Sequence, residues 1–121
     1  MAKKILIVDD ENSLRMLVNA TLEGENYTII QAKNGHEAIM IYELEKPDMV
    51  ILDLMMPGLS GIEALEIMRK SETSKNIPII ILTAKGQAGD KEKALKKGAS
   101  HFLKKPFSPL ELLTLVEKIL N

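Results

Sequence analysis

Short hydrophobic runs recur along the chain at fairly regular intervals, and each has the length of a β-strand. They cover residues 5–8, 27–32, 49–52, 79–82 and 101–103. The runs at 49–52 and 79–82 are hydrophobic at every position, which is typical of strands covered on both faces in a parallel sheet. The pattern therefore predicts five strands, two of them buried on both faces.

Hydrophobic residues with helical spacing occupy several of the segments between these runs. One stripe precedes the second run, one precedes the fourth and one follows the fifth. Their members are Leu14, Leu17, Val18 and Leu22; Ile62, Leu65 and Met68; and Leu112, Leu113, Val116, Ile119 and Leu120. Charged residues make up half of the segment 86–97 and few of its residues are hydrophobic, so it predicts only a short, mobile helix.

Polar residues mark several predicted helix boundaries. Ser60 followed by Glu63 has the form of a capping box, and Ser108 before Pro109 is typical of an N-cap with proline at the first helical position. Gly24 is a candidate for the end of the first helix. A strand followed by a helix, repeated five times with right-handed crossovers, predicts an α/β doubly wound (βα)5 fold. In this three-layer sandwich, helices cover both faces of a parallel sheet.

The composition fits one globular domain spanning residues 1–121. Hydrophobic residues make up 45% of the chain and charged residues 27%. A net charge of -1 argues against direct binding of nucleic acid, and the absence of cysteine excludes disulfides and thiolate metal sites. No hydrophobic run approaches the roughly 20 residues that span a bilayer, and the N-terminus lacks a signal-peptide pattern. We therefore expect a cytoplasmic protein without membrane attachment.

Polar residues follow four of the five predicted strands. Asp9 and Asp10 follow the first strand, Asp53 the third, Thr83 the fourth and Lys105 the fifth. Ligands of doubly wound sheets bind beyond the carboxyl ends of the strands, so these side chains are expected to meet. Two carboxylates about 5 Å apart repel each other by roughly 3 kcal/mol at an effective dielectric constant of 20. Three carboxylates with one lysine therefore call for a cation, and Mg²⁺ is the natural candidate because it prefers octahedral oxygen ligands.

Five separated motifs stand in order along the chain. They are ILIVDDE at 5–11, NGHEA at 34–38, KPDMVILDLMMPGLSG at 46–61, PIIILTA at 78–84 and FLKKPF at 102–107. Together they cover essentially the whole chain and strongly resemble the receiver domain of two-component response regulators. The resemblance implies a flavodoxin-like sheet of strand order 2-1-3-4-5. The hydrophobic pattern by itself does not provide this order.

The resemblance also implies how the acidic residues are used. Asp53 is the expected phospho-acceptor. Asp9, Asp10, Asp53 and the backbone carbonyl of Met55 are expected to hold Mg²⁺. Met55 and Lys85 match positions where the family varies its rate of dephosphorylation. Because Met55 cannot position an attacking water, we expect a longer-lived phosphoryl state than in a Met55→Asn variant.

The remaining site residues have expected roles in recognising the phosphoryl group. Lys105 would pair with the group, and the Thr83 hydroxyl would donate a hydrogen bond to one of its oxygens. Phe102 matches the switch aromatic of the family, which turns inward as Thr83 moves. The bond between Lys105 and Pro106 is where the family commonly has a cis peptide. A metal ion and a lysine suit this chemistry because they neutralise the charge that spreads over the phosphoryl oxygens in the transition state.

A receiver of this kind obtains its phosphoryl group from a sensor histidine kinase or a histidine phosphotransfer protein. We expect the donor to dock beside the first helix, near Asp9, Asp10 and Asn12, because it must reach Asp53 in line. The face formed by the fourth helix, the fifth strand and the fifth helix is expected to change on phosphorylation and to bind a downstream effector domain or protein. We expect a monomer, with dimerisation on phosphorylation as the alternative.

Each site residue also has a purely structural interpretation. Asp9 and Asp10 could cap the first helix, and Asp53 could be a loop carboxylate. Thr83 could be an ordinary β-branched strand residue, and Phe102 could be a core residue. The combination of these residues at strand ends favours the functional interpretation.

Three other functions compete with a phosphorylation switch. A hydrolase of the haloacid dehalogenase type would need a second aspartate two residues after Asp53, where this chain has Met55. A flavodoxin-like electron carrier would place a flavin phosphate beside Asp9, Asp10 and Glu11, which would repel it. A receiver that is not phosphorylated is disfavoured because all the site residues are present. We therefore expect a signalling switch and not an enzyme, either stand-alone or as the receiver half of a longer regulator such as a transcription factor.

Overall fold

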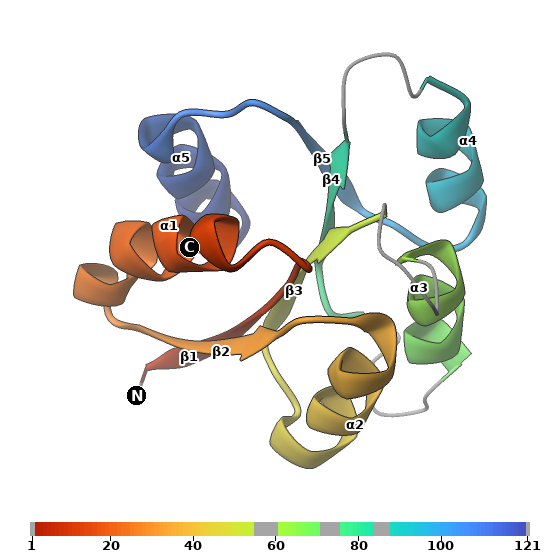
Figure 1. The fold of residues 1–121 in the computed structure, drawn as a ribbon, viewed down its shortest axis with the longest axis horizontal. Helices are drawn as coiled ribbons and strands as arrows, with labels where there is room; N and C mark the ends of the chain where they lie inside the picture. The colour runs from red at the N-terminus through yellow and green to blue at the C-terminus, as the bar shows by residue number, and fades with distance from the viewer. Residues whose placement is uncertain (1, 55–60, 71–75, 84–87, 121) are drawn as a thin grey trace.

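Five parallel strands form one sheet at the centre of the molecule (Figure 1). The structure, a computed structural model, describes residues 2–54, 61–70, 76–83 and 88–120. The strands are β1 (Lys3–Val8), β2 (Tyr27–Ala32), β3 (Met49–Asp53), β4 (Ile79–Thr83) and β5 (His101–Lys104). Their order is β2-β1-β3-β4-β5, which confirms the order implied by the family resemblance.

Helices cover both faces of the sheet and complete three layers. One face carries α1 (Asn12–Leu22), with the short 3-10 helix η1 (Glu23–Glu25) after it, and α5 (Pro109–Leu120); the other carries α2 (Gly35–Glu45), α3 (Gly61–Lys70) and α4 (Ala88–Lys96) (Figure 1). The predicted doubly wound (βα)5 fold is confirmed, and α4 is short, as its charged sequence predicted. Within the described ranges, no helix has the length and apolar character needed to cross a membrane.

The alternation of side chains along β1 divides the core in two. Ile5 and Ile7 pack in the cluster under α1 and α5, whereas Leu6 and Val8 pack in the cluster under α2, α3 and α4. All residues of β3 are buried, because this strand lies between β1 and β4 with helices on both faces. Burial of one large aliphatic side chain contributes roughly 1.5–3 kcal/mol, so the inner strands stabilise the sheet strongly.

The register of the strands brings their carboxyl ends to one edge. Val8 of β1 is level with Leu52 of β3, and Thr83 of β4 is level with Lys104 of β5. The polar residues that end or follow these strands therefore emerge beside one another.

Side-chain hydrogen bonds cap the first turns of α5 and α2, and those of α5 are reciprocal. The Ser108 hydroxyl accepts a hydrogen bond from the Glu111 N–H at 3.1 Å, and the Glu111 carboxylate accepts one from the Ser108 N–H at 3.1 Å. This confirms the N-cap predicted for α5. At α2, Asn34 Oδ1 accepts from the Glu37 N–H at 2.8 Å, and the Glu37 carboxylate accepts from the Lys33 N–H at 3.1 Å. The capping box predicted at Ser60 lies outside the described residues.

Two details of α1 differ from the prediction. Gly24 does not end the helix: α1 ends at Leu22, Gly24 lies within η1, and the left-handed conformation falls to Asn26, with φ 68°. Leu17 was expected in the buried stripe, but its side chain is 37% exposed. It lies about 100° around the helix from Val18, which faces the sheet, so its side chain points along the surface.

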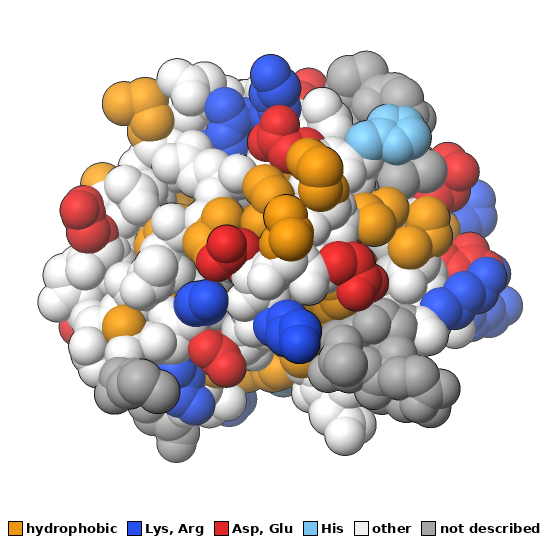
Figure 2. Space-filling model, turned by 90° about the horizontal axis from the view of Figure 1, so that it is seen from below, with side chains coloured by type: hydrophobic (Ala, Val, Ile, Leu, Met, Phe, Trp, Pro, Cys, Tyr) orange, Lys and Arg blue, Asp and Glu red, His pale blue; other side chains and the backbone are white. Residues whose placement is uncertain are grey.

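Helix α2 carries hydrophobic side chains on its inner and its outer sides. Ala38 and Tyr42 are buried, whereas Met40 and Leu44 are 58% and 74% exposed. Figure 2, which views the molecule from the side of α2, shows hydrophobic side chains gathered among charged ones. Because α2 lacks a clearly polar side, periodicity identifies it less readily than the other helices.

Candidate functional site

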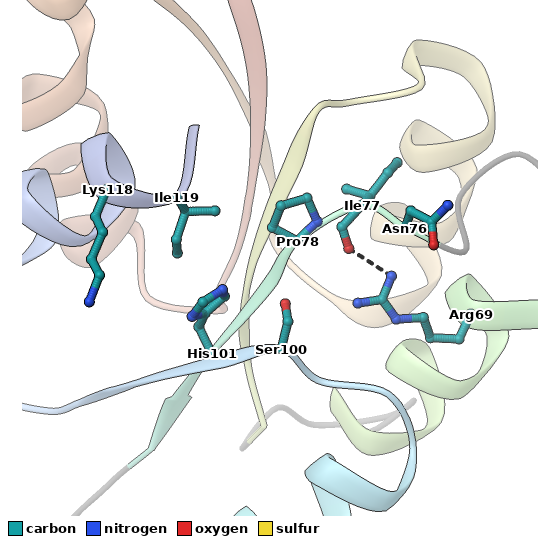
Figure 3. A pocket seen from close by; sticks show the side chains of 8 residues that line it. All are labelled: Arg69, Asn76, Ile77, Pro78, Ser100, His101, Lys118 and Ile119. Carbon is teal, nitrogen blue, oxygen red and sulfur yellow. Dashed lines mark hydrogen bonds between the residues drawn. The ribbon is translucent and has the colours of Figure 1, made fainter. Parts of the chain in front are cut away.

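A cavity of about 540 Å³ lies at the edge of the sheet where β4 and β5 begin (Figure 3). Beside it, Arg69 of α3 donates hydrogen bonds to the carbonyls of Ile77 at 2.7 Å and Gly98 at 2.8 Å. The guanidinium group therefore holds the segments before β4 and β5. Among the described residues, the group of three candidate metal ligands lies at the opposite edge.

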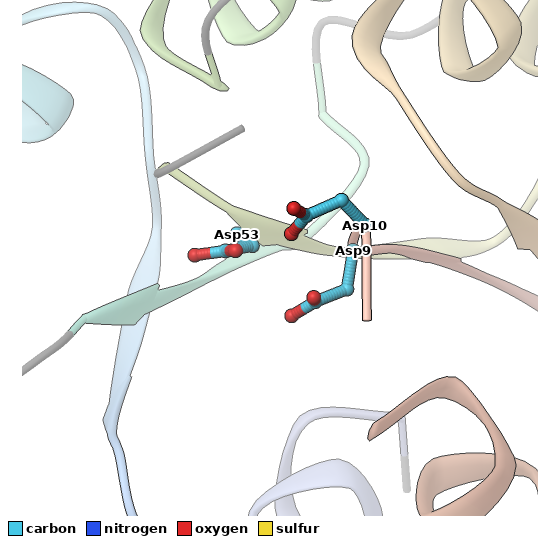
Figure 4. Close-up of side chains that lie close together, drawn as sticks. All are labelled: Asp9, Asp10 and Asp53. Carbon is cyan, nitrogen blue, oxygen red and sulfur yellow. The ribbon is translucent and has the colours of Figure 1, made fainter. Parts of the chain in front are cut away.

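Three carboxylates meet at that opposite edge, where β1 and β3 end (Figure 4). One oxygen from each of Asp9, Asp10 and Asp53 lies within 4.8 Å of the others. Asp9 is fully buried and Asp53 is 4% exposed, whereas Asp10 is exposed. The site therefore combines two acids that the sheet holds in place with one that reaches solvent.

Asp9 is held by every polar group that it has. Its N–H donates to the Ala32 carbonyl of β2 at 3.2 Å, and its own carbonyl accepts from Nη1 of Arg15 at 2.6 Å. Its Oδ1 accepts from the Glu11 N–H at 2.9 Å, and its Oδ2 accepts from Nζ of Lys105 at 3.1 Å. Together, these hydrogen bonds fix the direction of the buried Asp9 carboxylate.

Lys105 supplies the positive charge of the site. Its Nζ lies 3.1 Å from Asp9 Oδ2 and 3.5 Å from Asp53 Oδ2. Burial alone would lower the pKa of Lys105, but the charge of Asp53 and the hydrogen bond and charge of Asp9 together raise that pKa above its ordinary value. The ammonium form is therefore favoured between the two carboxylates. Lys104, by contrast, is exposed.

Thr83 and Phe102 lie on the neighbouring strands. Thr83 ends β4, and its carbonyl accepts a hydrogen bond from the Lys105 N–H at 2.6 Å. Phe102 is half-buried: it packs against the core cluster under α2, α3 and α4 and also lines a groove of about 500 Å³ beside α5. The peptide bond between Lys105 and Pro106 is cis, as the resemblance implied.

The donor set fits Mg²⁺. The three carboxylates carry three negative charges and Lys105, which pairs with two of them, carries one positive charge, so these four side chains have a net charge that a divalent cation would balance. Carboxylate oxygens are also the hard donors that Mg²⁺ prefers. Met55, whose carbonyl was expected to contribute, lies outside the described residues, as does Lys85.

The interpretation of the acidic pair as a helix cap applies only in part. The N-cap of α1 is Glu11, which makes no capping hydrogen bond through its own side chain. Asp9 accepts a bond from the Glu11 N–H, so it secures the turn before α1. Asp10 instead joins the cluster of carboxylates.

Sequence reasoning missed two residues that shape this edge. Arg15 binds the carbonyl of Asp9, as described above. Gly61 begins α3 against the end of β3, where a Cβ atom would lie 2.5 Å from Leu54 Cα and closer still to the carbonyl oxygen of Asp53. Glycine at the start of a helix, where alanine would be more favourable, was the available signal for Gly61. For Arg15, the signal was an arginine one helical turn after the acidic run.

Comparison with known proteins identifies the family. The family model described as response regulator receiver domain matches residues 5–117. The chain is 41% identical over 121 residues to the phosphate regulon transcriptional regulatory protein PhoB of Pseudomonas aeruginosa, covering 100% of this chain and 53% of that protein. It is 44% identical over 121 residues to the alkaline phosphatase synthesis transcriptional regulatory protein PhoP of Bacillus subtilis, covering 100% of this chain and 50% of that protein. The chain thus spans about half the length of these curated relatives.

Two solved structures of similar length share the fold. Chemotaxis protein CheY4 of Vibrio cholerae superposes with a TM-score of 0.93 at 32% identity, covering 99% of this chain and 100% of that one. The receiver domain of the sensor histidine kinase PA1611 of Pseudomonas aeruginosa, which was solved with a magnesium ion coordinated in the active site cleft, superposes with a TM-score of 0.88. It is 30% identical, and the match covers 98% of this chain and 97% of that one. With its sheet order and its family match, the chain belongs to the response regulator receiver domain family, a family of signalling switches.

Proposed function

We propose that the domain, taken as residues 1–121, accepts a phosphoryl group on Asp53 from a phosphohistidine of a sensor histidine kinase or of a histidine phosphotransfer protein. The observation that carries this proposal is the position of Lys105 Nζ, 3.1 Å from Asp9 and 3.5 Å from Asp53, beside a cluster of three carboxylates. A lysine between carboxylates at the carboxyl ends of parallel strands is suited to receive an anionic group.

The transfer exchanges one bond of phosphorus for another. A carboxylate oxygen of Asp53 forms the new P–O bond as the P–N bond of the donor breaks, and the electron pair of that bond stays on the imidazole nitrogen. Asp53 ends a fully buried strand, so its carboxylate is held ready for attack. Lys105 offsets the repulsion between this carboxylate and the incoming group, and the Thr83 hydroxyl at the end of β4 would donate a hydrogen bond to a phosphoryl oxygen.

Mg²⁺ is the proposed cofactor. Asp9, Asp10, Asp53 and the carbonyl of Met55 would hold it, and when bound it would neutralise charge on the carboxylates and the phosphoryl oxygens. Because the reaction ends on the domain's own side chain, we propose a switch and not an enzyme with a separate substrate. Histidine kinases supply phosphoryl groups in the cytoplasm, and we propose that location for the domain.

The proposed output surface is the face formed by α4, β5 and α5. Phe102 connects the core with this face, because it packs inward and also lines the groove beside α5. Leu103, Leu110 and Leu115 line the same groove, and Leu110 is exposed. We propose that a downstream effector domain or protein binds here and that the unphosphorylated domain is a monomer without direct contact to nucleic acid. Since PhoB and PhoP are named transcriptional regulatory proteins and are about twice as long, we propose that this chain is the receiver part of such a regulator.

Incubation with acetyl phosphate tests the proposal. The chain is incubated with and without Mg²⁺, and its intact mass is measured together with those of two variants, Asp53→Asn and Asp48→Asn. Asp48 is the matched control because it is an aspartate at the opposite edge, where its Oδ2 accepts from the Lys4 N–H at 2.8 Å.

We expect the chain and Asp48→Asn to gain the mass of one phosphoryl group only when Mg²⁺ is present. Asp53→Asn should gain nothing. A gain in Asp53→Asn equal to that of the parent chain would show that another residue is the acceptor. The same gain in mass without Mg²⁺ would show that phosphorylation of the chain does not require the metal.

A further inference from the structure

Arg15 of α1 binds three acceptors around the turn that carries Asp9 and Asp10. Its Nη1 donates to the Asp9 carbonyl at 2.6 Å, its Nη2 donates to Asn12 Oδ1 at 3.1 Å, and its Nε donates to Gln31 Oε1 at 3.2 Å. The guanidinium group thus joins the turn after β1 to the start of α1 and to strand β2. Only a planar group with several donors can bind acceptors in these three directions at once.

The carbonyl that Arg15 binds belongs to the peptide that joins Asp9 to Asp10. This peptide determines how the two side chains diverge, so a bond to its oxygen fixes both carboxylates relative to Asp53. Asp9 has further hydrogen bonds to hold it. Asp10 is exposed, and its direction depends more on its backbone.

Arg15 binds a backbone carbonyl and two side-chain amides, and it leaves the carboxylate oxygens of the acidic cluster to other partners. Lys105 differs, because it binds the Oδ2 atoms of Asp9 and Asp53 directly. Arg15 can therefore hold the acidic turn in place without competing for the atoms that a metal ion would bind.

We propose that Arg15 is a positioning residue for the Mg²⁺ site and that it presents Asp9 and Asp10 in the orientation that the metal requires. This inference rests on the proposed function. The direction of the change in Mg²⁺ affinity distinguishes this positioning role from a simple charge effect. Removal of a nearby positive charge should strengthen binding of a divalent cation by electrostatics alone, whereas loss of the positioning contact should weaken it.

Arg69 is a matched control, because Arg15 and Arg69 are the only arginines of the chain. Both bind backbone carbonyls through their guanidinium groups, but Arg69 lies at the opposite edge of the sheet (Figure 3). Arg69→Gln should therefore lower stability without changing the affinity for Mg²⁺. Arg15→Lys keeps the charge of Arg15 but lacks the planar fork.

The test measures Mg²⁺ binding by isothermal titration calorimetry for the parent chain and for Arg15→Gln, Arg15→Lys and Arg69→Gln. Circular dichroism and urea unfolding without Mg²⁺ establish that each variant is folded and give its stability. We expect Arg15→Gln and Arg15→Lys to bind Mg²⁺ about tenfold more weakly, the lower end of the usual effect of losing a residue that orients metal ligands. Arg69→Gln should bind as the parent does.

Affinity that is unchanged or increased in Arg15→Gln would overturn the inference while leaving the proposed function intact. Full affinity in Arg15→Lys would also overturn it, because charge without the fork would then suffice. Equal weakening in Arg69→Gln would assign the effect to general destabilisation and would overturn the inference. Absence of Mg²⁺ binding by the parent chain would instead refute the metal site of the proposed function, and the role of Arg15 with it.

Discussion

The contact between Gly61 and the end of β3 makes Gly61→Ala a demanding test of this structure. A methyl group at this position would lie 2.5 Å from Leu54 Cα and 3.1 Å from the carbonyl carbon of Asp53. Carbon atoms in favourable contact are about 3.5–4.0 Å apart, so the shorter distance must grow by about 1 Å. The obstructing atoms are backbone atoms beside a fully buried strand, and they cannot turn away as a flexible side chain would.

Two effects of opposite sign compete in this variant. Alanine in a helix is favoured over glycine by roughly 0.5–1 kcal/mol, which would stabilise the protein. Overpacking of a tight interior costs about 1–3 kcal/mol. We expect the steric effect to dominate and Gly61→Ala to lose about 1–2 kcal/mol of unfolding free energy, with a fall in melting temperature of about 5 °C.

The matched control is Gly24→Ala. Gly24 lies in η1, has no atom within 4 Å of its added methyl group and does not adopt a left-handed conformation. The same substitution there should be neutral or stabilising by up to about 1 kcal/mol. Urea unfolding at equilibrium measures both variants.

The same displacement should reach the chemistry of Asp53. Movement of its backbone shifts the proposed nucleophile, and a shift of about 1 Å can slow a positioned reaction by about a hundredfold. We expect phosphorylation of Gly61→Ala by acetyl phosphate to be at least about tenfold slower than that of Gly24→Ala. If Gly61→Ala were as stable as Gly24→Ala and reacted equally fast, the result would refute a close contact between α3 and β3 at Gly61.

Three further predictions follow from the site and from the cap of α5. Asp10→Asn removes one of three charges within 4.8 Å of one another. Because Asp10 is exposed, we expect the free energy of unfolding of the variant to rise by only about 1 kcal/mol without Mg²⁺. The variant should also lose most of the stabilisation that Mg²⁺ gives the parent, and thermal unfolding measures both effects. A lower stability of Asp10→Asn without Mg²⁺ would contradict the repulsion. The pKa of Lys105 is raised above its ordinary value of 10.5, so its ion pairs contribute fully below that pH and are lost as the pH rises through the raised pKa. The stability difference between the parent and Lys105→Met should therefore shrink in urea titrations above about pH 10.5, and a constant difference would refute the ion pairs. Ser108→Ala removes the hydroxyl that caps α5 and should cost about 1 kcal/mol in the same assay, whereas Ser13→Ala on the exposed side of α1 should cost less than about 0.5 kcal/mol.

The sequence could predict the strands and the edge at which they end, because both depend on local patterns. The uninterrupted hydrophobic runs of β3 and β4 determine their burial, and a polar residue directly after such a run must emerge at the carboxyl end. The order of the strands depends on which ones pair, and the periodicity carries no such information. It came from the family resemblance.

Features that depend on tertiary contacts were not accessible in this way. Leu17 has the spacing of a core residue, but the direction in which α1 packs leaves it at the surface. Arg15 is an ordinary helical residue until the turn after β1 and strand β2 bring their acceptors to it. The importance of Gly61 appears only when the end of β3 lies beside it.

The ion pair between Lys105 and Asp9 joins residues that are 96 positions apart in the chain. During synthesis, β1 and β3 emerge long before β5, so the carboxylates exist for a time without their lysine. The complete site can form only when the last strand has paired with β4. The chain can therefore receive a phosphoryl group only after the whole sheet has formed, and an incompletely folded chain would not be phosphorylated.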